Sequence, residues 1–508
     1  MKLNKLICVF LLASVLFLAQ GCKKFLDVND DPSNLKEVQI SQLLPSVTVN
    51  IGYLGASDLF RYSGLMTQQF SGQTTNSSQT FKEYERYNIN NSDVNNQWST
   101  IFSTILADIE KIIEASAKNE SPHYSGVAKL LKAYVFHITT DAWGDIPYTE
   151  AAKFTDQLMP KFDDDAAIYP ALLSLIDEGV AEINAPVSAF DPDKSTTIYI
   201  SNDWASAKNK WLRFANTLKL RLILHYSQKD AAFTAAQLIA VIGSGAQFMQ
   251  SNADNFLMKF NSTAQQQTPI VSVEGGQFKN SFWPNRTIVD MMNAKADPRR
   301  AFYFVPFPYK SNPATYKGAS ILDNSNSVAY SRLNTFLKGA ATINTVTVNP
   351  DGSITDNSIT WAGDAPSRLL TFAEYNFIRA EAALLYSSPG DAQTFFAQGI
   401  QASMTDAGVA QVDITTYLAA NGTLSGTNQN KLAQIINEKF IANFGVLMEP
   451  WSDWRRTGYP ALVPVSKQFA IYDQIPRSLF YPLSETNSNS NITQKSSMLE
   501  RVFWDTRP

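Results

Sequence analysis

The sequence predicts a mostly α-helical protein in which pairs of helices flank one long, loop-rich excursion. In several separate stretches, apolar residues recur three and four positions apart, the spacing of one face of an α-helix. Between about residues 244 and 367 this spacing gives way to a region rich in Asn, Ser, Thr, Gly, Pro and aromatic residues. With 17% charged and 12% aromatic residues, the 508-residue chain has the composition of a folded globule.

Residues 1–21 have the layout of a signal peptide. Two lysines precede the uncharged run Leu6–Ala19, which is shorter than the ~20 residues that cross a bilayer. Cys22 follows Gly21, directly after the predicted signal peptide, and it has no disulfide partner in the mature chain because Cys8 leaves with the signal. A cysteine after "LAQG" resembles the lipobox of bacterial lipoproteins, whose thiol is acylated. An ordinary secretion signal with an incidental thiol is the alternative.

The remaining chain is expected to form a tether and one domain. Residues 22–36, which include "DVNDDPSN", are predicted to be a turn-rich tether that leads into the fold. Residues 37–508 are predicted to form a single domain that carries the excursion as an insertion. No other stretch approaches the length of a membrane span.

Five stretches of the domain carry the helical stripe. They are 98–112, 131–138, 211–225, the helix–turn–helix pattern at 371–407, and 432–447. Gly144 and Pro147 are expected to end the second helix. The small residues Ala380, Ala382 and Ala383 allow the two helices of the fourth stretch to approach closely. Antiparallel helix pairs of this kind are the units of helical repeat proteins, although no strict repeat period is visible.

The excursion is predicted to consist mainly of irregular loops. Within it, "VTVNPDGSIT" predicts a short β-hairpin whose turn is Asn349–Gly352. Long loops on a rigid scaffold are where binding residues concentrate. Ligand-binding side chains are therefore expected in this region.

The sequence gives little support for nucleic-acid binding or for common forms of catalysis. The 42 Lys and Arg residues are balanced by 46 Asp and Glu residues, and no basic patch stands out. Common nucleophile, phosphate-loop and zinc motifs are absent. His137 and His225 extend apolar stripes, which favours hydrogen-bonded core histidines over metal ligands. We expect no cofactor and no metal.

Two groups of carboxylates keep a glycosidase open as an alternative. Glycoside hydrolysis needs two carboxyl groups that face one bond, and Asp163–Asp165 and the pair Asp141 and Asp145 are the candidates. Asp164 or Asp165 can equally cap a helix that begins near Ala166, because a carboxylate accepts hydrogen bonds from free helix N–H groups. Capping is the stronger interpretation.

The aromatic residues are the better functional lead. A sugar ring presents one apolar face and a rim of hydroxyl groups, so it suits an indole or phenol flanked by amide or guanidinium groups. Six side chains have this character and are the predicted ligand contacts: Gln69, Tyr84, Trp283, Asn285, Arg286 and Trp361. The alternative for each ring is packing of a loop against the helices.

Several segments, taken in order, resemble the SusD/RagB family of nutrient-binding outer-membrane lipoproteins, in its SusD-like branch found in Bacteroidetes. The segments are "CKKFLDVNDDPSNL", "LLKAYVFHITTDAWGDIPYTEA", "KWLRFANTLKLRLILHY", "EPWSDWRRTGYP" and "IPRSLFYPLSETNSN". The resemblance implies tetratricopeptide-like helix pairs packed against an irregular half with a few short β-hairpins. It also implies a surface-exposed, acylated protein that captures oligosaccharides or peptides without catalysis. The implied partner is a SusC-type TonB-dependent β-barrel transporter.

The segment "WSDWRRTGYP" is expected to serve folding rather than ligand binding. Arg455 and Arg456 have Glu449 and Asp453 nearby as pairing partners. Two alternatives to a nutrient-binding protein remain: a lipid-anchored glycosidase and a helical-repeat scaffold for envelope proteins.

Overall fold

The computed structural model describes residues 39–73, 80–153, 158–276, 278–323 and 327–507. The predicted signal peptide, Cys22 and the tether lie outside these residues. Within the described residues, no helix combines the length and the apolar character that are needed to cross a membrane.

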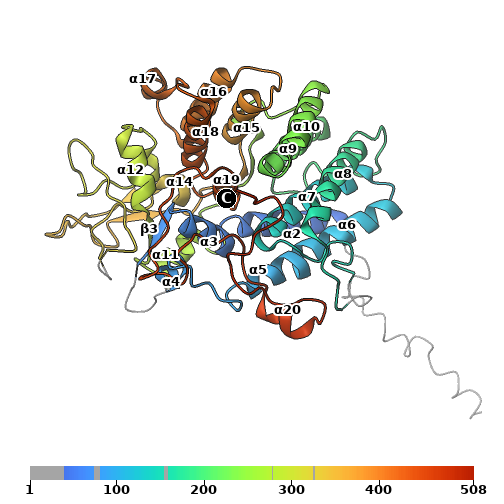
Figure 1. Ribbon diagram of the computed structural model, residues 1–508, viewed down its shortest axis with the longest axis horizontal. Coiled ribbons are helices and arrows are strands. Elements are labelled where there is room, and N and C mark those ends of the chain that lie inside the picture. Colours follow the sequence, from blue (N-terminus) through green and yellow to red (C-terminus); the bar gives the residue numbers. More distant parts are fainter. Residues whose placement is uncertain (1–38, 74–79, 154–157, 277, 324–326, 508) are drawn as a thin grey trace, which may run out of the picture.

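Helices make up most of the regular structure (Figure 1). The α-helices are α2 (Ile40–Leu54), α3 (Asp58–Met66), α4 (Thr80–Glu85), α5 (Asn95–Ser99), α6 (Ala107–Lys118), α7 (Pro122–Trp143), α8 (Asp165–Ile183), α9 (Trp204–His225), α10 (Ala231–Gly243), α11 (Pro269–Gly275), α12 (Arg286–Ala294), α13 (Arg300–Tyr303), α14 (Thr335–Lys338), α15 (Phe372–Leu385), α16 (Ala392–Ala407), α17 (Gln411–Asn421), α18 (Asn428–Ala442), α19 (Glu449–Thr457) and α20 (Leu483–Ser488). The other helical turns are the π-helix η2 (Thr100–Leu106) and the 3₁₀ turns η4 (Tyr226–Gln228) and η5 (Asn252–Asp254).

The long helices pack as neighbouring pairs, which confirms the predicted helix-pair architecture. The pairs α7 with α8, α9 with α10, and α15 with α16 are in contact, and α18 packs on α15. In Figure 1 these helices follow one another around the upper and right-hand parts of the molecule, and α19 lies near the centre. Gly399 of α16 faces Phe377 of α15 so closely that an added Cβ would lie 2.9 Å from that ring.

The helix boundaries follow local capping chemistry. Gly144 ends α7 with a φ of +77°, as its position predicts. The Asp164 side chain accepts a hydrogen bond from the Ala166 backbone N–H, which confirms the predicted cap of α8. These two signals depend only on neighbouring residues.

Two predicted helical stretches differ in detail. The stripe over 98–112 is divided among α5, the π-helix η2 and α6, although Ile105 and Ile109 are still buried. Helix α18 ends at Ala442. Phe444 and Leu447 lie in the loop that follows, and both side chains are buried in the core. In both places the apolar spacing predicts the burial of these four side chains correctly, because a loop residue can fill the core as well as a helical one.

The loop-rich half contains three antiparallel pairs of short strands. They are β1 (Phe70–Gly72) with β3 (Phe282–Pro284), β2 (Phe256–Met258) with β6 (Ser367–Leu370), and β4 (Ala341–Ile343) with β5 (Ile359–Trp361). The predicted turn is confirmed, since Gly352 N–H donates to the Asn349 carbonyl (2.9 Å) beyond the bridge between Val348 and Ile354. This half lies on the left of Figure 1, beside α12 and α14.

The segment around α19 is buried, as its predicted folding role requires. Arg456 pairs with Asp453 (2.9 Å) and with Glu381. The expected pairing of Arg455 with Glu449 or Asp453 is wrong. Arg455 Nη1 instead donates to the backbone carbonyls of Asp141 (2.7 Å) and Arg477 (2.8 Å). The backbone oxygens are closer because α19 directs this side chain toward the end of α7.

A pocket between two tryptophans

A pocket of about 260 Å³ opens in the loop-rich half. Its walls come from α11, the segment that leads into β3, α14 and the hairpin that ends in β5. Two of the predicted ligand contacts, Trp283 and Trp361, line it together. They are 78 positions apart in the sequence, and antiparallel strand pairing on two different partners brings them to one site.

Trp283 forms a fixed wall of this pocket. Its side chain is 2% exposed and its indole N–H donates to the Asn280 carbonyl (2.9 Å). Tyr330 packs edge-on against the ring at 5.9 Å between centroids. The indole therefore lines the pocket while its polar atom is satisfied inside the fold.

Trp361 is more exposed and carries a cation on its ring. The Lys338 ammonium lies 3.3 Å from the ring centroid and also pairs with Glu274. Burial lowers the pKa of Lys338, and the Glu274 carboxylate partly opposes that shift. The indole N–H of Trp361 donates to Asn334 (3.2 Å). These contacts hold the ring in place beside the pocket.

Asp356 forms ion pairs with the two other basic residues of the pocket, Lys279 and Arg332. Lys279 and Arg332 both lie 3.0 Å from its carboxylate oxygens, and the Asn280 amide donates to it (3.1 Å). Burial raises the pKa of Asp356, but the contacts from Lys279, Asn280 and Arg332 outweigh burial and hold that pKa below its usual value. Asp356 is therefore ionised at neutral pH.

Two of the predicted ligand contacts lie inside the fold. Gln69 is buried, and its amide donates to the Phe440 (3.1 Å) and Asn443 (3.2 Å) carbonyls. Tyr84 is buried too, and its hydroxyl donates to Asp93 (3.3 Å). The Gln69 amide joins two distant segments, the Tyr84 hydroxyl makes a local contact, and neither residue lines the pocket.

Asn285 and Arg286 follow Trp283 in the sequence but do not line the pocket. The Asn285 side-chain oxygen Oδ1 caps α12 by accepting from Thr287 N–H (2.9 Å), and the side-chain amide Nδ2 donates to Glu85 (3.2 Å). The Arg286 side chain is 48% exposed and pairs with Asp323 (2.7 Å). A strand end followed by a helix start turns these two side chains away from the indole.

The charged residues of the pocket were not predicted. Lys279, Arg332, Lys338 and Asp356 lie in the excursion, where no apolar period distinguishes one charged residue from another. The one available signal is the placement of Lys338 and Asp356 next to hairpin strands. That signal is too common to select them.

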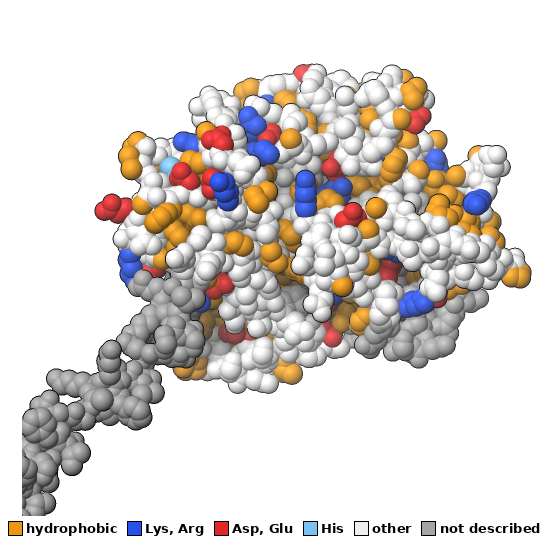
Figure 2. All heavy atoms as spheres, turned by 180° about the vertical axis from the view of Figure 1, so that it is seen from behind, with side chains coloured by type: hydrophobic (Ala, Val, Ile, Leu, Met, Phe, Trp, Pro, Cys, Tyr) orange, Lys and Arg blue, Asp and Glu red, His pale blue; other side chains and the backbone are white. Residues whose placement is uncertain are grey.

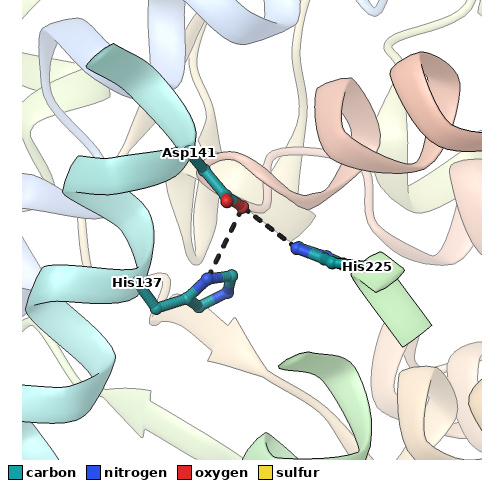
Figure 3. Close-up of side chains that lie close together, drawn as sticks. All are labelled: His137, Asp141 and His225. Atoms are coloured by element: carbon teal, nitrogen blue, oxygen red, sulfur yellow. Dashed lines mark ion pairs between the residues drawn. The ribbon is translucent and has the colours of Figure 1, made fainter. Parts of the chain in front are cut away.

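His137, Asp141 and His225 form a buried group whose ligand atoms lie close enough together to hold a metal ion (Figure 3). Asp141 Oδ2 lies 3.5 Å from His137 Nδ1 and 3.3 Å from His225 Nδ1. The other Asp141 oxygen accepts from Tyr169 and from the Trp504 indole (3.1 Å). The carboxylate is thus saturated by protein donors, which fits the predicted core role of both histidines better than metal binding.

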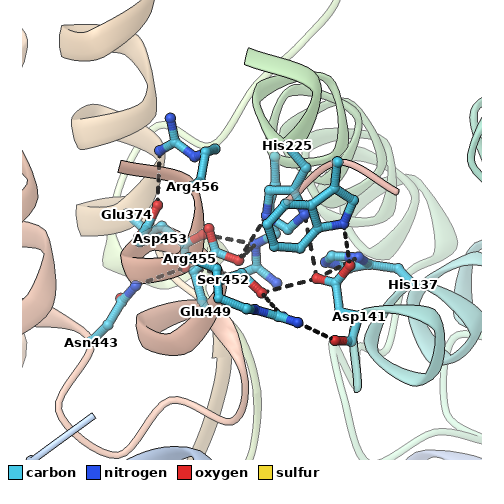
Figure 4. Close-up of polar contacts among 12 residues, drawn as sticks. His137, Asp141, His225, Glu374, Asn443, Glu449, Ser452, Asp453, Arg455 and Arg456 are labelled. Atoms are coloured by element: carbon cyan, nitrogen blue, oxygen red, sulfur yellow. Dashed lines mark hydrogen bonds and ion pairs between the residues drawn. The ribbon is translucent and has the colours of Figure 1, made fainter. Parts of the chain in front are cut away.

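The same group continues into a network of buried charges (Figure 4). Ser452 donates to Asp141 (3.0 Å), and His225 Nε2 lies 3.4 Å from Glu449. Glu449 in turn pairs with Lys439 (2.7 Å). The network joins α7, α9, α18 and α19, so its role in the fold is to lock these helices together.

Opposite pKa shifts distinguish the two histidines. Burial lowers the pKa of His137 to about 4, so this imidazole is neutral. Burial also disfavours the charged form of His225, but Asp141 and Glu449 outweigh it and raise that pKa to about 9. For Asp141, burial acts to raise the pKa of the carboxyl group. The two histidines outweigh burial and keep that pKa below its usual range.

We expect His225 to make stability depend on pH between 6.5 and 9. Its folded-state pKa exceeds the unfolded value, so its contribution is complete below pH 6.5 and is lost as the pH rises through 9. The stability difference between the wild type and His225→Gln should shrink by on the order of 2–3 kcal/mol from pH 6 to pH 9.5. Urea unfolding of both proteins at each pH measures it. A difference that is constant with pH contradicts the assignment.

The carboxylates considered for glycoside hydrolysis are occupied by hydrogen bonds from the protein, mostly from backbone N–H groups. Asp163 accepts from the Tyr148 (2.9 Å) and Thr149 (2.8 Å) backbone N–H groups. Asp145 accepts from Asp165 N–H (2.9 Å), and Asp165 accepts from Phe503 N–H (2.8 Å).

On the face shown in Figure 2, acidic and basic side chains are interspersed, and neither sign covers a large area.

Helix pairs packed against a loop-rich half that holds an aromatic pocket define a binding protein on a helical-repeat scaffold. The family described as "starch-binding associating with outer membrane" matches residues 32–482. The chain therefore belongs to the SusD-like family, and the resemblance read from its motifs is confirmed. This is a family of non-catalytic binding proteins, which confirms the prediction of a protein that is not an enzyme.

Solved structures share the fold over nearly their whole length. A chitin-binding protein is 22% identical with a TM-score of 0.74, covering 92% of this chain and 99% of its own. A SusD homologue from Bacteroides uniformis is 23% identical with a TM-score of 0.71, covering 92% and 100%. A chitin-binding SusD homologue from Flavobacterium johnsoniae is 21% identical with a TM-score of 0.70, covering 91% and 99%. No curated protein matches the sequence.

Proposed function

We propose that this protein captures oligosaccharides at the outer membrane and passes them to a SusC-type TonB-dependent transporter. The observation that carries the proposal is the meeting of Trp283 and Trp361 in one pocket. Amide and hydroxyl groups of Asn280, Asn357 and Thr360 line the same pocket and suit the hydroxyl rim of a sugar. The family description and the chitin-binding proteins of the same fold support a glycan as the ligand.

Binding of starch- and chitin-derived oligosaccharides should depend on Trp361. Trp361→Ala removes the half-buried indole from the pocket and is expected to cost ~1–3 kcal/mol of binding free energy. Trp361→Phe should retain most of the affinity, because a flat ring remains. Calorimetric titration measures both.

Trp204 provides a matched control for this test. It stacks on His123 at 4.9 Å between centroids and does not line the pocket. Trp204→Ala should bind as the wild type does. If Trp361→Ala also binds normally, the pocket is not the ligand site.

The anchor is proposed at Cys22, with residues 1–21 removed. Two or more acyl chains at this position hold a protein stably on a membrane, whereas a single chain binds weakly. Cys22→Ser should therefore release the protein from the membrane fraction into the soluble fraction. Fractionation followed by immunoblotting measures the distribution. Retention of the variant on the membrane contradicts the anchor.

Co-purification tests the transporter partner. A tagged protein from detergent-solubilised outer membrane should bring down a β-barrel protein of the TonB-dependent class. The helical-repeat scaffold is the alternative, and it predicts a folded protein partner with no binding of small saccharides.

A further inference from the structure

The ionisable side chains of the pocket do not balance. Three basic residues, Lys279, Arg332 and Lys338, and two acidic residues, Glu274 and Asp356, line it, so its formal charge is +1. The whole chain carries −4. A positive pocket in an acidic protein sets up a local attraction for anions.

The excess positive charge is located by the pairing pattern. Lys338 and Glu274 form one closed pair, and their side chains are 6% and 17% exposed. Lys279 and Arg332 share the single carboxylate of Asp356, each at 3.0 Å. One carboxylate therefore serves two cations, and the uncompensated charge belongs to Lys279 and Arg332.

Both cations keep hydrogen-bond donors that the protein does not use. Arg332 Nη2 donates to the Ile354 carbonyl (3.0 Å) and to Asp356, and no bond to another described residue involves its Nη1 or Nε. The Lys279 side chain is 50% exposed and has one carboxylate contact for its three N–H groups. These free donors are the kind that bind a carboxylate or sulfate group strongly.

The surroundings of these donors suit a sugar rather than a free anion. Trp283 and Trp361 supply apolar walls, and Asn280 and Asn357 supply amides within the same pocket. Arg332 itself lies over the Trp283 ring, 6.0 Å from its centroid. An anionic group held by Arg332 would thus belong to a ligand whose remaining atoms lie against the aromatic walls.

We infer that the pocket binds an anionic saccharide unit, a sugar that carries a carboxylate or sulfate group, in preference to a neutral one. The inference rests on the proposed function, since it names the class of saccharide that the same pocket takes. The ligand anion pairs with the cation that Asp356 leaves uncompensated.

The test compares charged and neutral ligands of one length by calorimetry. The probes are trigalacturonate, the neutral galactose trimer with the same linkage, and a sulfated galactose oligomer. We expect the charged trimer to bind about tenfold more tightly than the neutral one. This difference in affinity corresponds to the contribution of one charge-assisted hydrogen bond. The preference should weaken as salt is raised. Tight binding of only the uronate or only the sulfated probe identifies which anion the pocket takes.

Three variants assign the preference to these residues. Arg332→Gln combined with Lys279→Gln should abolish the preference, and Lys229→Gln, an exposed lysine outside the pocket, should leave it unchanged. Asp356→Asn frees both cations and should increase the preference, a gain that a misfolded variant cannot produce. Equal or tighter binding of the neutral trimer overturns the inference and leaves the proposed function standing. Binding of no saccharide by the wild type overturns both.

Discussion

Replacing Asp141 by Ala should lower the free energy of unfolding by about 3–5 kcal/mol, the cost of removing one partner from a buried ionic network. Asp141 is fully buried and accepts from Tyr169, Ser452 and Trp504. It also faces the charged His225 at 3.3 Å. Its loss removes the shared acceptor of these donors and leaves the buried positive charge of His225 with Glu449 as its one remaining carboxylate partner among the described residues.

A matched exposed pair shows whether burial causes the effect. Asp177 pairs with Lys219 (2.6 Å), and its side chain is 63% exposed. Asp177→Ala should cost less than about 1 kcal/mol, because water and salt screen such a pair. Chemical unfolding of both variants gives the comparison. Similar losses at the two sites would show that the buried network does not stabilise the fold.

Arg299→Met is expected to cost about 3–5 kcal/mol as well. Arg299 is fully buried and pairs with Asp297 (2.5 Å) and Glu438 (2.8 Å). It also donates to Ser403 of α16 (3.0 Å). These contacts join the start of α13 in the loop-rich half to α16 and α18 in the helical half. The substitution leaves two buried carboxylates without this cation.

Removing the stranded charges tests that explanation. Adding Asp297→Asn and Glu438→Gln to Arg299→Met should recover part of the lost stability, because fewer unpaired charges remain buried. Arg286→Met makes the same change at an ion pair whose arginine is 48% exposed, and it should cost less than about 1 kcal/mol. The same unfolding experiment measures all three variants. If the triple variant is less stable than Arg299→Met alone, charge imbalance is not the cause.

Much of the helical half could be predicted because the start, the end and the buried face of a helix depend on residues that are close together in the sequence. The cap at Asp164, the stop at Gly144 and the stripe from Trp211 to His225 each depend on residues within a few turns of one another. The π-helix at 100–106 and the early end of α18 were missed. Apolar spacing reports which side chains are buried, and it does not report how the backbone delivers them.

The pocket could be predicted only in part. Large aromatic residues in a loop-rich region suit a sugar ring, which predicts Trp283 and Trp361 as ligand contacts, and the structure places both at one pocket. Gln69 and Tyr84 fitted the same chemical description but do not line the pocket. Residue type shows what a side chain can bind, whereas tertiary packing decides whether the side chain borders a cavity.

The helical stretches, their caps, the hairpin turn and the family could be predicted from the amino-acid sequence, because these depend on residue order over short distances. That Lys279 and Arg332 share one carboxylate, and that Arg455 donates to backbone carbonyls, follows only from the tertiary structure. Those outcomes depend on which loops lie side by side. Long-range packing sets that proximity, and the residue types along the chain do not encode it locally.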